Sequence, residues 1–428
     1  MPPGTTDYLP RVVDNELDLL LPALPAISLE GPRAVGKTET ASRRARTVNR
    51  LDEPERRQLI EADPGRLVDG DPPILIDEWQ LLPRSWDLVR RAVDADAAPG
   101  QFLLTGSTTP TEHPTHSGAG RIVSLRMRPL TLHERGIGQP TVSLAALLAG
   151  HRPAIEGGTD VRLVAYVDEI VGSGFPGLRG LSGRALRTQL DGYLTRIAEH
   201  DLPEVGLSVR NPSLLRRWMT AYAAATATTA SYETIRDAAT SGEGHKPAKS
   251  TTQPYRDMLE RLWIIDALPA WLPSRNPLAR LSSPPKHHLA DPALAARLLG
   301  ADMAALLDAQ PLGPTIPRRG ALLGALFESL VTLGVRVAAQ AAEAQVKHLR
   351  TRGGEHEIDL IVERGDHRVV AIEVKLSQTV DNQDLRHLLW LRDQIGDDLL
   401  DAVVVTTGTE AYRRPDGIAV VPAALLGP

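Results

Sequence analysis

The sequence predicts a multi-domain α/β protein, and three observations carry that prediction. The 428 residues exceed the size of one ordinary core. Residues 26–150 alternate short apolar runs with longer amphipathic stretches, which is the pattern of a parallel sheet with covering helices. A helical stretch follows, and residues 320–428 alternate predicted strands with two predicted helices.

The composition narrows the class of protein. The absence of cysteine excludes disulfides, thiolate metal sites and cysteine nucleophiles. A net charge of -5 gives no overall attraction to nucleic acid, so any such contact must come from local basic patches. We see no secretory signal and no uninterrupted apolar run of about 18 residues, so we expect a cytoplasmic protein with no membrane contact.

The order of predicted elements divides the chain into five parts. Short apolar runs at 26–30, 74–77, 101–105 and 122–125 predict the strands of the first part. Three helical patterns followed by the apolar run 263–268 predict a winged helix-turn-helix. The expected parts are a P-loop domain (1–150), a helical segment (151–210), a winged-helix-like domain (211–285), a connector (286–319) and a C-terminal α/β domain (320–428).

A phosphate-binding loop follows the first predicted strand and precedes a helical stretch. It reads Gly31, Pro32, Arg33, Ala34, Val35, Gly36, Lys37 and Thr38, which fits the Walker A pattern. Glycines let backbone N–H groups curl around phosphate oxygens, and the next helix directs its positive end at them. We expect Lys37 to reach the β and γ phosphates and Thr38 to ligate Mg²⁺.

Three later segments supply candidate catalytic groups. The apolar strand before Asp77 and Glu78 has the Walker B form, so Asp77 is expected to hold Mg²⁺ through water and Glu78 to orient the attacking water. Ser107 follows another strand and is a candidate γ-phosphate sensor. Arg121 is a candidate cation for transition-state charge, in the same chain or from a neighbouring subunit, although a surface arginine explains it equally well.

These motifs resemble a widespread prokaryotic family of AAA-type ATP-binding proteins whose members carry a C-terminal domain of unknown function. The resemblance rests on the loop, on Ile76–Glu78, Leu104–Ser107 and Gly120–Arg121, and on Pro129–Thr131 with Glu134. It implies ATP as the nucleotide. The segment His288–Pro292 departs from the family pattern, which places any role of Asp291 in doubt.

A β-hairpin is predicted near the C-terminus, and one of its faces is polar. Apolar residues occupy the even positions of its strands, and the odd positions include Glu357, Asp359, Glu373 and Lys375. A turn centred on residue 366 sets Asp359 opposite Glu373. Two opposed carboxylates are destabilising unless a cation lies between them, which favours Mg²⁺ or Mn²⁺. A solvated polar face with a surface ion pair is the alternative.

The hairpin and the helix before it resemble the PD-(D/E)xK nuclease core. The resemblance implies that Glu328, Asp359 and Glu373 bind a divalent metal and that Lys375 positions or activates a water for attack on a phosphodiester. The order of the predicted elements agrees with that core. A basic cluster at Lys246, Lys249 and residues 250–252 begins the third helix of the middle domain, where it could face nucleic acid or serve protein docking.

Two hypotheses of different class follow. In the first, the protein is an ATPase whose nucleotide state controls a winged helix and a nuclease-like module acting on DNA or RNA. In the second, it is a nucleotide-gated switch or scaffold, in which the C-terminal fold is inactive and the output is binding of a partner protein. The sequence leaves the oligomeric state open in both.

Overall fold

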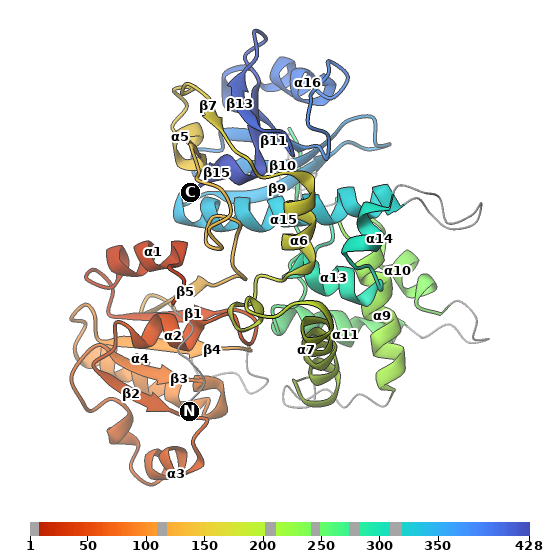
Figure 1. Ribbon diagram of the computed structural model, residues 1–428. Coiled ribbons are helices and arrows are strands. Elements are labelled where there is room, and N and C mark those ends of the chain that lie inside the picture. The colour runs from red at the N-terminus through yellow and green to blue at the C-terminus, as the bar shows by residue number, and fades with distance from the viewer. Residues whose placement is uncertain (1–7, 109–117, 202–210, 241–248, 274–282, 309–318) are drawn as a thin grey trace.

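The computed structural model describes residues 8–108, 118–201, 211–240, 249–273, 283–308 and 319–428. It shows the α/β class that the sequence predicts, with a parallel sheet in the N-terminal part, helices in the middle and a second sheet in the C-terminal part. Figure 1 shows the two sheets at opposite ends of the molecule, with the helical part beside the first.

The N-terminal sheet has five parallel strands in the order β2-β3-β4-β1-β5. The strands are β1 (Ala26–Glu30), β2 (Thr47–Arg50), β3 (Ile74–Asp77), β4 (Phe102–Gly106) and β5 (Ile122–Arg126). The helices are α1 (Val12–Leu20), α2 (Lys37–Ser42), α3 (Pro54–Ala62) and α4 (Arg84–Ala95). The four predicted strands are confirmed. Strand β2 was not predicted, because as an edge strand it buries only Asn49 and so lacks an apolar run.

The middle part is helical. It contains α6 (Leu163–Val171), α7 (Gly183–Arg196), a π-helical turn (Ile197–Asp201), α9 (Pro212–Ala224), α10 (Tyr232–Ala238), α11 (Lys249–Arg261), α13 (Pro292–Leu298) and α14 (Met303–Leu307). After α11 the chain is extended over residues 264–268, where it pairs antiparallel with residues 286–290. The predicted strand at 263–268 is therefore an extended segment held by isolated bridges.

The C-terminal sheet has eight strands in the order β7-β13-β14-β12-β11-β10-β9-β8. They are β7 (Glu156–Gly158), β8 (Ala270–Trp271), β9 (Gln345–Arg350), β10 (Glu357–Glu363), β11 (Val369–Val374), β12 (Leu399–Thr406), β13 (Glu410–Arg413) and β14 (Ala419–Pro422). Helices α15 (Arg319–Ala341) and α16 (Arg386–Ile395) pack against it. The predicted hairpin register is confirmed, since Leu360 pairs with Ile372 and Val362 with Val370.

The predicted polar face of that hairpin is only partly present. Leu360 and Ile372 pack in the core that includes α15, whereas Ile361 and Ala371 pack in a second core with Leu388 of α16. Both faces of the sheet are therefore covered along most of the hairpin. The prediction of one polar face was wrong there, because a central strand buried on both sides reads as a continuous apolar run.

Part of the chain before residue 160 belongs spatially to the C-terminal sheet. Strand β7 pairs with β13, and β6 (Val142–Ser143) pairs with β15 (Leu426–Gly427). Between them, α5 (Leu144–Leu148) contacts α15 and β12. Figure 1 shows α5 and β7 beside the C-terminal strands. These elements are too short to show a periodic pattern, so the sequence analysis grouped them with the neighbouring parts.

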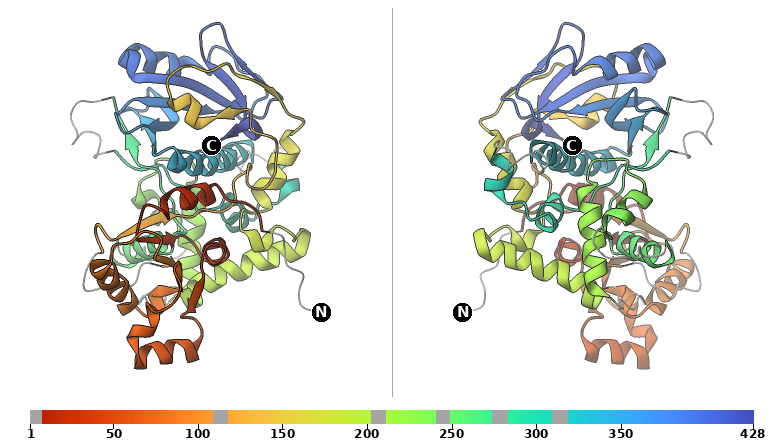
Figure 2. Two further views of the ribbon diagram at one scale, coloured as in Figure 1. Left: turned by 90° about the vertical axis from the view of Figure 1, so that its left-hand side faces the viewer. Right: turned by 90° about the vertical axis from the view of Figure 1, so that its right-hand side faces the viewer.

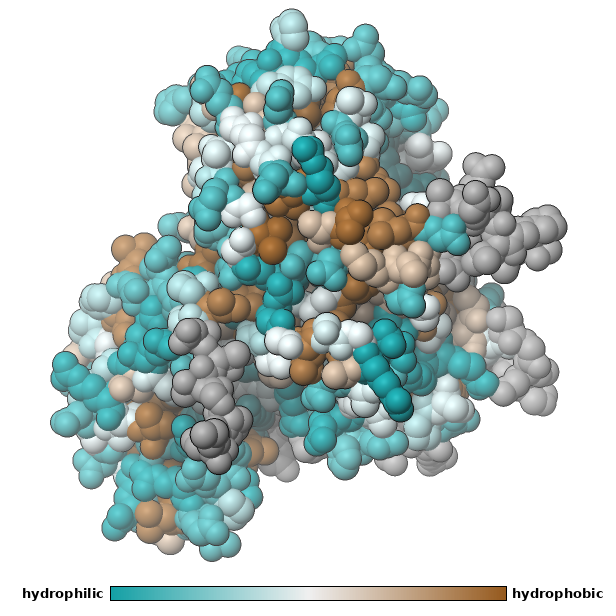
Figure 3. Space-filling model, in the orientation of Figure 1, coloured by the Kyte–Doolittle hydropathy of each residue, from teal (hydrophilic) through white to brown (hydrophobic). Residues whose placement is uncertain are grey.

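Helix α15 lies between the C-terminal sheet and the rest of the molecule in both views of Figure 2. Among the described residues it is the one helix long and apolar enough to cross a membrane, and 56% of its most apolar window is buried in the protein. It also carries Glu328 and Arg336, which pair with other parts of the chain. Figure 3 shows hydrophobic side chains gathered at its level. We therefore describe α15 as a core helix.

One buried carboxylate joins three parts of the chain. Asp266 lies on the extended segment after α11, and each of three arginines places a guanidinium nitrogen 2.9 Å from its carboxylate. The arginines are Arg126 at the end of β5, Arg128 just after it, and Arg336 of α15. Burial by itself raises the pKa of Asp266, but the three positive charges overcome this and hold the pKa below its ordinary value.

We expect Asp266→Asn to lower the free energy of unfolding by about 3–5 kcal/mol, because it leaves buried guanidinium charges unpaired. The pKa of Asp266 is lower in the folded protein than in the unfolded chain. The stabilisation by the Asp266 ion pairs is therefore present above pH about 4 and is lost as the pH falls. Urea denaturation at neutral pH measures the change, with Asp393→Asn on the exposed face of α16 as the control. Equal stability of the two variants would contradict the expectation.

Candidate functional site

The phosphate loop connects β1 to α2 through two glycines in the left-handed region. Gly31 has φ +155° and Gly36 has φ +101°. A Cβ atom on Gly31 would lie 2.1 Å from the carbonyl oxygen of Met127, so no other residue fits there without moving the backbone. The loop from Gly31 to Thr38 thus ends at the first turn of α2, with the helix N-terminus directed at it.

Lys37 folds back over the loop. Its ammonium group donates to the carbonyl oxygens of Gly31 at 2.9 Å and Pro32 at 2.8 Å, and the side chain is buried. Burial lowers the pKa of Lys37 to about 8, against the opposing effect of the Glu78 and Asp77 carboxylates. Both hydrogen-bond partners are neutral, so a phosphate oxygen would make a stronger, charge-assisted bond to the same group.

Thr38 and Asp77 meet at the mouth of the loop. The Thr38 hydroxyl donates to Asp77 Oδ1 at 2.7 Å, and Thr105 of β4 donates to the same oxygen. Asp77 is buried at the carboxyl end of β3. The hydroxyl of Thr38 in the first turn of α2 and the carboxylate of Asp77 at the end of β3 are oxygen ligands of the kind that Mg²⁺ prefers, so these residues fit a magnesium ion bound with a nucleotide.

Glu78 is held beside this pair by two neighbours. Its backbone is left-handed, with φ +54°. Its Oε2 accepts a hydrogen bond from the Ser107 hydroxyl at 3.0 Å and another from the Gln80 amide. The Gln80 amide also donates to the Ser107 oxygen at 3.1 Å. Gln80 was not among the predicted site residues, because no motif in the sequence identifies it.

The middle part contacts the loop directly. Arg33 of the loop forms an ion pair with Asp201 at the end of the π-helical turn. Tyr193 of α7 donates a hydrogen bond from its hydroxyl to the Arg33 carbonyl at 3.2 Å. A change in the loop therefore reaches α7 without any intermediate residue. No sequence spacing could show this contact, because the partners lie in different parts of the fold.

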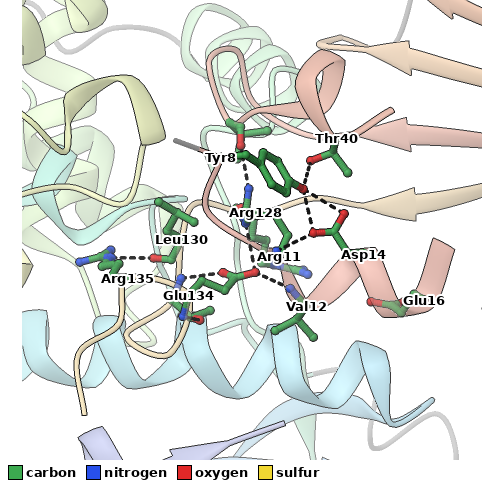
Figure 4. Close-up of polar contacts among 12 residues, drawn as sticks. Tyr8, Arg11, Val12, Asp14, Glu16, Thr40, Arg128, Leu130, Glu134 and Arg135 are labelled. Carbon is green, nitrogen blue, oxygen red and sulfur yellow. Dashed lines mark hydrogen bonds and ion pairs between the residues drawn. The ribbon is translucent and has the colours of Figure 1, made fainter. Parts of the chain in front are cut away.

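Arg11 contacts the loop through Val35, and Figure 4 shows it beside Arg128 and Glu134. Its guanidinium donates to the carbonyl oxygens of Val35 at 2.9 Å and Arg128 at 2.5 Å, and its Nε lies 3.1 Å from Glu134 Oε1. The same glutamate oxygen accepts from the backbone N–H of Val12. Arg11 is buried and lies before the first helix, where the sequence gave no motif to identify it.

Arg121 does not lie at the loop. It directly precedes β5, and β5 runs parallel to β1, so it lies at the edge of the sheet opposite the carboxyl ends that carry Lys37 and Asp77. Its Nε is 2.8 Å from Asp94 of α4 on the exposed surface. The structure therefore brings Glu78 and Ser107 to the loop and does not bring Arg121 there within one chain.

The carboxylates of the C-terminal hairpin line a cavity of about 460 Å³ together with Glu328 and Lys375. Asp359 accepts a hydrogen bond from the backbone N–H of Val374 at 2.9 Å. The Lys375 ammonium donates to Glu373 Oε1 at 2.8 Å. The predicted set is therefore assembled at one place, but Glu373 already has a cation of its own.

Lys286, from the segment predicted to be a connector, pairs with carboxylates of this cavity without lining it. Its ammonium lies 2.8 Å from Glu328, 3.0 Å from Asp359 and 3.6 Å from Glu357. Burial raises the pKa of Glu328 to about 8. Burial also acts to raise the pKa of Asp359, but Lys286 overcomes it and lowers that pKa. Since the carboxylates are paired with Lys286 and Lys375, the set as it stands does not fit a divalent metal.

The basic cluster and Asp291 of the middle part do not lie at either site described above. Lys246 lies outside the described residues, as do the side chains of residues 249–251. Asp291 is buried and caps α13, where it accepts hydrogen bonds from the backbone N–H of Ala293 at 2.8 Å and the Ser173 hydroxyl at 2.9 Å. Its role in the structure is to join α13 to the turn before α7.

The parallel sheet, the glycine loop and the Thr38–Asp77 pair define a P-loop domain of AAA type. In agreement, residues 24–135 match a family described as an AAA domain. Residues 164–305 and 323–426 match two families described as domains of unknown function, DUF8612 and DUF4143.

Two curated relatives extend over most of the chain. They are the uncharacterized proteins Mb2031c of Mycobacterium bovis and Rv2008c of Mycobacterium tuberculosis. Each is 26% identical to this chain over 414 residues, which cover 93% of this chain and 80% of the relative. The similarity therefore includes all three parts of the fold.

The lowered pKa of Lys37 predicts proton uptake on nucleotide binding. Above pH about 8 the side chain is neutral in the free protein, and a bound triphosphate favours its charged form. We therefore expect ATP affinity to fall about tenfold per pH unit between pH about 8 and 10. Calorimetry in buffers of different ionisation enthalpy measures the uptake. Lys37→Arg, whose guanidinium stays charged, should show none, and equal uptake in both proteins would contradict the assignment.

Proposed function

We propose that this chain is a Mg²⁺-dependent ATPase that uses its nucleotide state to reposition the middle and C-terminal parts. The observation that carries the proposal is the Thr38–Asp77 hydrogen bond of 2.7 Å at the mouth of a glycine loop, with Glu78 beside it. A loop that only bound an anion would need no paired acids at this point. The AAA match over residues 24–135 supports the same class.

Each residue of the loop has a defined task in this proposal. The backbone N–H groups from Arg33 to Thr38 bind phosphate oxygens, and Lys37 exchanges its carbonyl partners for the β and γ phosphates. Thr38, and Asp77 through water, would hold a magnesium ion, which would supply positive charge against the phosphates. Glu78 orients the attacking water and accepts its proton, while Ser107 and Gln80 hold the Glu78 carboxylate in place.

The link to the rest of the chain is the Arg33–Asp201 ion pair. Phosphate binding places negative charge beside Arg33, so the arginine then has two competing anionic partners. Release of Asp201 would free the end of α7 and transmit the nucleotide state to the helical part. In this proposal α9, α10 and α11 serve as a winged-helix-like docking surface, and Arg121 acts only if a neighbouring subunit presents it.

For the C-terminal part, the geometry favours a switch over a nuclease. Lys286 and Lys375 already neutralise the carboxylates that a catalytic metal would need. We therefore propose that the nuclease-like fold binds a partner protein when ATP binding repositions the C-terminal part of the chain. Metal-dependent cleavage of DNA or RNA is the second candidate, favoured by the hairpin register that opposes Asp359 and Glu373.

Hydrolysis is tested by Glu78→Gln. We expect phosphate release to slow by about a hundredfold or more, because the amide cannot accept a proton from water, while ATP binding is retained. Single-turnover kinetics and a separate ATP titration measure the two effects. Glu61→Gln on the exposed face of α3 makes the same chemical change away from the loop and should turn over normally. Equal turnover by both variants would remove Glu78 from the mechanism.

The two outputs are separated by a nicking assay on supercoiled plasmid with Mg²⁺ and ATP. The switch proposal expects the wild-type chain and Asp359→Ala to give the same background, because the pocket carries lysines in place of a metal. Nicking by the wild-type chain that disappears in Asp359→Ala would establish the nuclease instead. Lys347→Met, which breaks an ion pair with Glu363 on the same sheet, controls for general loosening of the fold.

A further inference from the structure

Lys286 is buried where a charged side chain is costly. Its side chain is 1% exposed, whereas the side chains of Glu328 and Asp359 are 13% and 14% exposed. An isolated ammonium is not stable in such a place, so its charge must be compensated locally. The compensation is provided by Glu328, Asp359 and, more distantly, Glu357.

The charges of the cavity explain why it is the cation that is buried. Five carboxylates line it, from Glu328, Glu357, Asp359, Glu373 and Asp384. Lys375 lines it as well and pairs with Glu373, and Lys286 pairs with three of the other carboxylates. The carboxylates repel one another, which is why Asp359 contributes to raising the pKa of both Glu328 and Glu373. Lys286 reduces that repulsion, because its ammonium pairs with three of the five carboxylates.

The backbone holds Lys286 in this position. Its N–H donates to the Leu268 carbonyl at 2.9 Å, and its own carbonyl accepts from the Leu268 N–H at 2.8 Å. Asp266, two residues before Leu268, forms ion pairs with three arginines, which hold this segment in place. The ammonium cannot leave the carboxylates without breaking this pairing or turning the whole side chain away.

We propose that Lys286 is the resident cation of the C-terminal acidic cavity, and that its ammonium replaces a divalent metal there. The cavity is a latent metal site, from which Mg²⁺ and Mn²⁺ are excluded as long as Lys286 is present. The inference bears on the nuclease-like part of the proposed function and does not depend on ATP hydrolysis.

The test is Mn²⁺ binding to the full, nucleotide-free chain, followed by electron paramagnetic resonance. Lys286→Met keeps the length of the side chain and removes its charge. We expect this variant to gain one Mn²⁺ equivalent per chain with an affinity at least about tenfold above that of the wild type. The gain should disappear in the double variant Lys286→Met with Asp359→Asn.

Lys347→Met is the matched control, because it also removes a lysine from an ion pair of the C-terminal sheet, with Glu363. Its carboxylate partner does not line the cavity, so it should gain no Mn²⁺. Failure of Lys286→Met to gain Mn²⁺ while it remains folded would overturn the proposal.

A second measurement applies even if Lys286→Met does not fold. The wild-type chain and Asp359→Asn should bind Mn²⁺ equally weakly, because Asp359 has its cation already. Stronger Mn²⁺ binding by the wild type than by Asp359→Asn would show that a metal binds these carboxylates, and it would contradict the proposal. ATP binding is titrated separately on the wild-type chain, so failure of the proposed ATPase would appear in a different experiment.

Discussion

The ion cluster at Asp266 is the constraint on which the arrangement of the molecule depends. The N-terminal sheet contributes Arg126 and Arg128, the core helix α15 contributes Arg336, and the carboxylate comes from the segment after α11. A buried carboxylate attracts guanidinium groups in a medium of low dielectric constant, and a buried guanidinium without it is costly. Each part of the chain therefore supplies a charge that is unstable without the other parts.

The cluster also lies on a continuous line of contacts between the two candidate sites. Arg11 binds the carbonyl of Val35 in the phosphate loop and the carbonyl of Arg128, whose side chain pairs with Asp266. Two residues after Asp266, Leu268 pairs with Lys286 in the acidic cavity. Packed networks of this kind transmit a change only where an element has two arrangements. In the function we propose, the Arg33–Asp201 ion pair is that element.

The features that could be predicted from the sequence are those that depend on residues close together in the chain. The loop from Gly31 to Thr38 combines a residue pattern with a strand before it and a helix after it, and the register of the hairpin follows from alternation about residue 366. Contacts between distant segments have no such signature. Arg11, Asp201 and Lys286 are each single residues in otherwise ordinary stretches, and their partners become known only once the chain is folded.

The same limit explains why the acidic cavity was predicted as a metal site. Electrostatics alone predicts a cation beside Asp359 and Glu373, and in the structure Lys286 pairs with Asp359 and Lys375 pairs with Glu373. The metal stays a prediction, because an ammonium relieves the repulsion between carboxylates as a metal would. Lys286 comes from a segment more than seventy residues before Asp359, so no spacing within the hairpin could show it.

Lys37 and Lys286 show how one side chain serves opposite purposes in this chain. Only six of its 48 basic residues are lysine, and both of these are buried in candidate sites. The partners of Lys37 are neutral carbonyls, so burial prevails and lowers its pKa to about 8. Lys286 faces carboxylates, which overcome the effect of burial and raise its pKa. Lys37 thus has no anionic hydrogen-bond partner among its two carbonyls, and a bound triphosphate would provide one. Lys286 has its anions already, and we propose that it thereby takes the place of a metal.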